Sequence, residues 1–90
     1  MLLNGEQLKE IESMASLFFS PADIALNLEI EDTEEFCALF ELREGSAYRA
    51  YQRGRLKTEA ELRSAIRQAA LNGSSPAQLQ MISFMKDSTI

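Results

Sequence analysis

Apolar residues recur at helical spacing through most of this 90-residue chain, and no stretch alternates cleanly enough between apolar and polar residues to predict a strand. This periodicity predicts an all-α fold with about five helices. A chain of this length with 46% apolar residues is expected to form one core rather than two. We therefore expect a single helical domain over residues 1–90, with a helix-turn-helix-like unit in 1–45 and a long helix plus a C-terminal helix in 46–87.

An apolar stripe indicates the first helix, and capping residues indicate the second. The first begins at Asn4, and its apolar residues follow one stripe. We expect the buried stripe to be Leu8, Ile11, Ala15 and Phe18, with Met14 and Leu17 beside it. Ser20 is a typical N-cap and Pro21 fits the first helical position, where its missing N–H costs nothing. These residues predict a second helix from Pro21 to about Leu28.

The third helix follows a short connection and is expected to cross the second at a steep angle. Asp32 or Thr33 would cap its start, and Gly45 would end it with a C-terminal cap. The two helices should share one apolar cluster, made of Ile24, Leu28, Ile30, Phe36, Leu39 and Phe40.

The segment from Ser46 to Leu71 allows two interpretations. Gly54 lowers helix propensity by about 1 kcal/mol relative to alanine, and residues 58–61 could form a new capping box. We favour one continuous helix, about 39 Å long at 1.5 Å per residue. Such a helix would protrude or pack against a second copy. The residues expected to share one of its sides are Tyr48, Tyr51, Leu62, Ala65, Ile66 and Ala69.

The last helix is predicted to start at Ser75 and Pro76, which repeat the cap-and-proline start of the second helix. Its expected buried stripe is Leu79, Ile82 and Met85, with Met81 and Phe84 beside it. Residues 87–90 are expected to be a frayed tail.

The charged residues are sorted along the chain. Residues 1–42 hold ten acidic residues and one basic residue, whereas residues 43–67 hold seven basic residues and three acidic ones. The net charge of -5 therefore hides a strong asymmetry. Since such an asymmetry concerns binding partners rather than the fold, residues 43–67 become the candidate anion-binding surface.

Several kinds of chemistry are not expected. The chain has no histidine and a single cysteine, Cys37, so the usual zinc sets, an intramolecular disulfide and histidine-based catalytic pairs are excluded. We expect a non-enzyme without cofactors or metals, and Cys37 as a small, partly buried thiol. No apolar run is long enough for a membrane span or a signal peptide, which favours a cytoplasmic protein.

The second and third helices resemble a DNA-reading helix-turn-helix with a longer turn. Glu29 stands where such turns often have glycine, and Phe36 follows Ile30 one residue later than in the commonest version. They could equally be two ordinary core helices. The expected outward positions of the third helix are Thr33, Glu34, Cys37, Ala38 and Glu41. None of these side chains is among those that commonly donate to base edges, so base reading by this helix is not expected.

The basic stretch YRAYQRGRLK, residues 48–57, is the stronger candidate for DNA binding. Its expected phosphate contacts are Arg49, Arg53, Arg55 and Lys57. Arg49 and Arg53 are four residues apart and share a helix face. The alternative is a charged helix surface that is only solvated.

The chain resembles the small terminase subunits of tailed phages and prophages over about residues 6–86. The resemblance lies in SPADIALNLEI, in an Ala-x-x-x-Gly-Arg element (Ala50, Gly54, Arg55) and in a junction with Ala70, Gly73 and Ala77. It implies an N-terminal helix-turn-helix, recognition of viral DNA and assembly into oligomers. It also implies a large terminase subunit as partner, which would hold the ATPase and nuclease, and no catalytic residue in this chain.

Two hypotheses about function follow. In the first, the protein is a DNA-binding, terminase-small-subunit-like protein that contacts the DNA backbone with its basic stretch and forms a homo-oligomer through its long helix. In the second, it is a protein-protein interaction adaptor whose acidic N-terminal half docks on a basic partner. DNA binding that weakens steeply with salt would favour the first.

Overall fold

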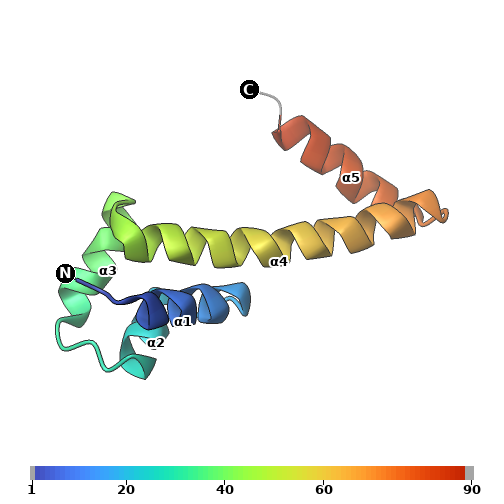
Figure 1. Cartoon of the computed structure of the whole chain (residues 1–90). Helices are drawn as coiled ribbons and strands as arrows, with labels where there is room; N and C mark the ends of the chain where they lie inside the picture. Colours follow the sequence, from blue (N-terminus) through green and yellow to red (C-terminus); the bar gives the residue numbers. More distant parts are fainter. Residues whose placement is uncertain (1, 89–90) are drawn as a thin grey trace. The chain divides into compact units, whose positions relative to one another are not determined.

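The computed structural model describes residues 2–88, and these residues form α-helices and no strand (Figure 1). The helices are α1 (Gly5–Ser16), α2 (Pro21–Asn27), α3 (Thr33–Leu42), α4 (Gly45–Leu71) and α5 (Ser75–Asp87). The predicted all-α fold with about five helices is confirmed, and α4 is continuous through Gly54 as expected. In the described chain, no helix has the length and apolar character needed to cross a membrane.

Contacts group the chain into two compact units, Met1–Thr58 and Glu59–Ile90, so their boundary falls inside α4. The first unit contains α1, α2, α3 and the N-terminal half of α4. The second contains the rest of α4 and α5, and it therefore holds a helical hairpin. Of the predicted frayed tail, Asp87 still belongs to α5, and residues 89–90 lie outside the described part.

Side-chain caps start four of the helices. Asn4 and Gln7 form a reciprocal capping box at α1, with N···O distances of 2.8 and 2.9 Å. Ser20 caps α2 as expected, and Asp32, one of the two candidates, caps α3. The predicted N-cap of α5, Ser75, is wrong by one residue. Ser74 is the cap, because its Oγ accepts a hydrogen bond from the backbone N–H of Ala77.

Among residues 2–88, three non-glycine residues adopt left-handed backbone conformations next to helix ends: Phe18 (φ 64°), Glu29 (φ 56°) and Arg43 (φ 55°). This conformation costs about 1–2 kcal/mol for an L-residue other than glycine. Arg43, not Gly45, is the C-cap of α3, which corrects the expected position. Glu29 has the left-handed backbone conformation that glycine adopts more easily, so the turn has the expected shape although its residue is not glycine.

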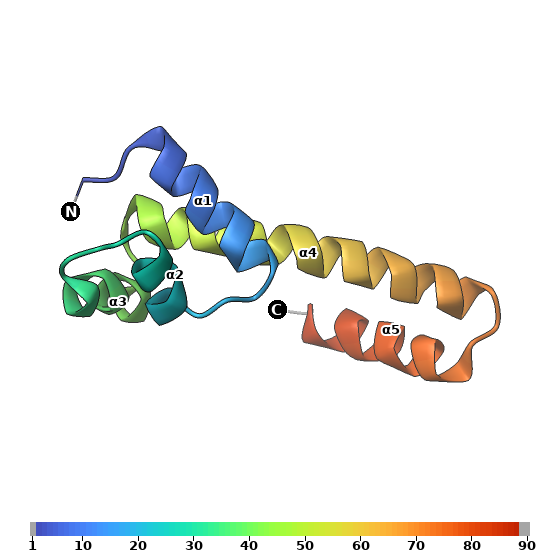
Figure 2. The same ribbon diagram turned by 90° about the horizontal axis from the view of Figure 1, so that it is seen from below.

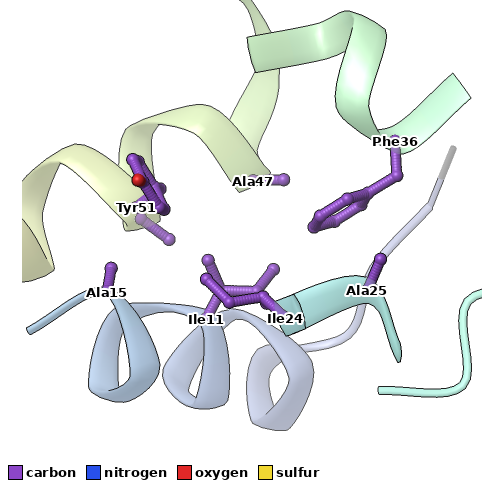
Figure 3. Close-up of a cluster of buried hydrophobic side chains, with 8 residues drawn as sticks. Ile11, Ala15, Ile24, Ala25, Phe36, Ala47 and Tyr51 are labelled. Atoms are coloured by element: carbon purple, nitrogen blue, oxygen red, sulfur yellow. The ribbon is translucent and has the colours of Figure 1, made fainter. Parts of the chain in front are cut away.

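The core of the first unit lies where α1, α2, α3 and α4 meet, and Figure 3 shows its side chains pointing toward one another. Ile11, Ile24 and Phe36 are its largest fully buried side chains. The expected cluster between α2 and α3 is present except for Leu39, since Leu28, Ile30 and Phe40 pack against this core and Leu39 does not. Phe18 is 45% exposed, contrary to expectation, because α1 ends before it.

Small residues bring α4 close to α1. The core-facing residues of α4 in this unit are Ala47, Ala50, Tyr51 and Gly54. A Cβ atom on residue 54 would overlap the backbone oxygen of Glu12 and would lie 2.9 Å from the Cβ of Ala15. One turn further along α4, the Oγ1 of Thr58 donates a hydrogen bond of 2.6 Å to the backbone oxygen of Ser16. Gly54 therefore sets the distance between the two helices.

Replacing Gly54 by alanine tests this contact. The added methyl group should destabilise the protein by roughly 1–3 kcal/mol, because it must displace helix backbone, despite an intrinsic helix gain of about 1 kcal/mol. The free energy of unfolding in urea measures the effect. Gly5→Ala is the matched control, since a Cβ at this helical glycine meets nothing within 4 Å. Equal effects at both positions would contradict the close contact.

The hairpin of the second unit buries little, and the stripe expected on α5 is wrong. In Figure 2, α5 turns back toward the C-terminal half of α4, and the guanidinium carbon of Arg63 on α4 lies 4.0 Å from the ring centre of Phe84 on α5. Ala77 is buried, and Met81 and Phe84 are partly buried. The expected stripe is instead exposed: Leu79 is 69%, Ile82 45% and Met85 63% exposed. The buried side of α5 is therefore the side that carries Ala77, whose small side chain lets α5 and α4 approach.

Candidate nucleic-acid interface

Three of the four predicted cations follow one exposed face of α4. Arg49, Arg53 and Lys57 are spaced by four residues, which turns each about 40° from the last. All three are exposed, on the side of the helix opposite the core-facing residue Tyr51. We call Arg49, Arg53 and Lys57 the basic face of α4.

Within the basic face, Arg53 has a partner of its own. Its Nε lies 3.5 Å from the Oε1 of Glu12 on α1, and the two side chains are 62% and 40% exposed. An exposed pair of this kind contributes about 0–1 kcal/mol and is screened by salt, so Arg53 can exchange this carboxylate for another anion at small cost. Within residues 2–88, Arg49 and Lys57 have no carboxylate partner.

Arg55 is separated from these three cations. Its guanidinium carbon lies 5.4 Å from the ring centre of Phe18 and 5.7 Å from that of Tyr51. Its Nη1 also donates a hydrogen bond of 3.1 Å to the hydroxyl oxygen of Tyr51. The side chain is partly buried, and it links the end of α1 to α4. The structure thus gives Arg55 intramolecular partners and does not place it on the basic face.

Substitution of Arg55 should therefore affect stability. Arg55→Ala removes two cation–π contacts and one hydrogen bond, and we expect the free energy of unfolding to fall by about 1–2 kcal/mol. Arg49→Ala, on the same helix, is the control and should stay within about 0.5 kcal/mol of the native protein. Urea denaturation followed by circular dichroism measures both. Equal stabilities of the two variants would refute a structural role for Arg55.

The outward face of α3 is acidic. Thr33, Glu34, Ala38 and Glu41 are exposed as predicted, whereas Cys37 is only partly exposed and packs against the core. The partly buried thiol that we expected at Cys37 is thus confirmed. Because the exposed positions carry no Arg, Lys, Asn or Gln, this face offers none of the usual donors for base edges and would repel phosphates.

Sequence reasoning missed the residues that hold the cations in place. Tyr51 and Arg55 are four residues apart on one helix, so their contact could have been expected from spacing. The contact of Arg55 with Phe18 could not, because it depends on the left-handed turn that ends α1. The partnership of Glu12 and Arg53 likewise depends on how closely α1 approaches α4.

Comparisons of the chain with protein-family models, with curated proteins and with solved structures found no match.

Proposed function

We propose that this protein binds the phosphate backbone of DNA through the basic face of α4, as a non-enzymatic protein similar to phage small terminase subunits. The observation that supports this most is the alignment of Arg49, Arg53 and Lys57 on one exposed side of α4, opposite the core-facing residue Tyr51. Two of these cations have no carboxylate partner within the described chain. Under this proposal, a large terminase subunit is the partner that receives the DNA and supplies the ATPase and nuclease.

The charge distribution favours backbone contact over base reading. Affinity for duplex DNA comes largely from neutralising phosphates, and the basic face provides three cations for this. The usual reading helix of such a tandem would be α3, yet its outward side chains include Glu34 and Glu41. We therefore propose that α4 faces the DNA, that α3 faces away from it, and that binding depends weakly on sequence.

Salt dependence tests the proposed contact. With three phosphate contacts, the logarithm of the binding constant for duplex DNA should fall with the logarithm of salt concentration with a slope of about -2.7. In Arg49→Ala/Lys57→Ala the slope should shrink to about -1, because one phosphate contact is left. Fluorescence anisotropy of a labelled duplex measures both slopes.

The matched control is Lys9→Ala/Lys86→Ala, which removes the same charge from exposed positions outside the basic face. This control should keep the native slope. If the native protein does not bind DNA at low salt, the proposed DNA binding is wrong. An equal loss in both double variants would show that net charge, rather than the basic face, governs binding.

We also propose that the protein associates with itself through the hairpin of residues 59–88. The exposed apolar residues of this hairpin include Leu62, Leu71, Leu79 and Ile82. Fully burying a leucine or isoleucine contributes about 1.5–3 kcal/mol, and the hairpin itself buries little beyond Ala77. A second hairpin could cover Leu79 and Ile82, which are three residues apart on α5.

Polar substitution of this stripe should weaken the association. Leu79→Ser/Ile82→Ser should raise the dissociation constant by a factor of at least about 100, since each substitution counts in both copies of a symmetric dimer. Sedimentation equilibrium measures the constant. Leu26→Ser is the control, because Leu26 is 78% exposed but lies on α2 in the other unit. An unchanged constant in the double variant would exclude this surface.

The acidic outward side of α3 supports a second candidate function, that of an adaptor for a basic protein. The supporting observation is that Glu34 and Glu41 are both exposed on one side of this helix. The DNA titration separates the two functions, since an adaptor would not bind DNA at low salt.

A further inference from the structure

Two oppositely charged helix surfaces belong to the same compact unit, Met1–Thr58. One is the basic face of α4. The other is the outward side of α3, and we call its residues Glu34, Ala38, Glu41 and Leu42 the acidic face of α3. All four are exposed, and Leu42 is 64% exposed. Among residues 2–88, neither glutamate of the acidic face has an ion-pair partner.

The two faces cannot meet within one copy. Phe40 of α3 packs on Tyr48 and Tyr51 of α4, with ring centres 6.1 and 5.0 Å apart. These contacts and buried Phe36 hold α3 against the core side of α4. The basic face lies on the side of α4 opposite Tyr51, so α4 itself separates the carboxylates of α3 from it.

The spacing of the charges on the two faces agrees. Arg49 and Lys57 are eight residues apart, which is about 12 Å along the helix axis. Glu34 and Glu41 are seven residues apart, which is about 10.5 Å. Two helices laid side by side can therefore pair both carboxylates with both cations.

The surroundings of the charges also suit a helix-helix contact. Ala38 lies between the two glutamates, and its small side chain lets another helix approach. Each face also carries an exposed leucine, Leu42 on α3 and Leu56 on α4, and these are 64% and 59% exposed. At 100° per residue, Leu56 lies within about 20° of Arg49 around the helix. Apolar contact would thus accompany the ion pairs.

We propose that a second copy of this chain supplies the missing partner, with the acidic face of α3 in one copy lying along the basic face of α4 in another. The contact joins two different surfaces, so it is head-to-tail unless two copies exchange it reciprocally. The neighbouring copy covers the surface assigned to DNA, and DNA therefore competes with it. This competition rests on the proposed function, whereas the contact between copies does not.

Charge-swapped variants test the contact between copies. Glu34→Lys/Glu41→Lys makes both faces basic, and Arg49→Glu/Lys57→Glu makes both faces acidic. Each variant alone places like charges across the contact, whereas a mixture restores opposite charges. Binding between a tagged and an untagged copy is measured for each pair by biolayer interferometry. The salt concentrations are about 0.05 M and about 0.5 M NaCl, between which screening rises strongly.

The expected result is a loss of binding on the order of tenfold in each variant alone at low salt, and recovery in the mixture. No substitution touches residues 59–88, so association through the hairpin contributes equally to every pair. Glu6→Lys/Glu10→Lys is the control for net charge, since both residues are exposed on α1. On its own, this control should bind like the native protein, because both faces are unchanged. Native-like association of either variant alone, or a mixture no stronger than its components, overturns the proposal.

A duplex DNA titration of the native assembly tests the competition. DNA should release the neighbouring copy as it binds, and simultaneous binding of both overturns the assignment of the contact to the basic face. If DNA does not bind, the proposed function fails, and the charge-swap result alone decides on the contact between copies.

Discussion

The first unit depends on the close approach of α1 and α4 at Gly54. The absence of a side chain there lets the backbone of Glu12 and the methyl group of Ala15 lie against α4. The hydroxyl of Thr58 then donates a hydrogen bond to the backbone oxygen of Ser16, the last residue of α1, which fixes the position of α1 along α4. With α1 in place, Ile11 and Ala15 close the core against α2 and α3. A steric requirement at one residue therefore governs how four helices pack.

The helical period of α4 decides which of its charges reach solvent. Because Tyr51 faces the core, Arg49, Arg53 and Lys57 lie on the opposite, exposed side of the helix, from which Arg53 still reaches Glu12 of α1. Arg55 lies off that face, and Phe18 and Tyr51 surround its guanidinium. The phenylalanine and tyrosine rings of the core hold α3 on the inner side of α4, so its carboxylates stay apart from the basic face. The separation of charge along the sequence thereby becomes a separation of charge in space.

Local features of the chain were largely predictable. Capping chemistry and periodicity predicted the caps at Ser20 and Asp32, the core residues Ile24 and Phe36, and the continuity of α4. The errors occurred where an alternative local choice was equally good. Arg43 rather than Gly45 ends α3. The stripe of Leu79 and Ile82 is exposed because α5 buries the side that carries Ala77 instead. Periodicity identifies an apolar stripe, but it does not say what covers that stripe.

The sequence by itself determined the all-helical class, most helix ends and the sorting of acidic and basic residues along the chain, because these depend on neighbours within a few residues. Only the tertiary structure decided that Gly54 is a contact point, that Arg55 is held by aromatic rings and that three cations share one face. These features require residues such as Ser16 and Thr58, far apart in the sequence, to be in contact. The distance between Ser16 and Thr58 depends on how whole helices pack, and a local sequence pattern does not predict it.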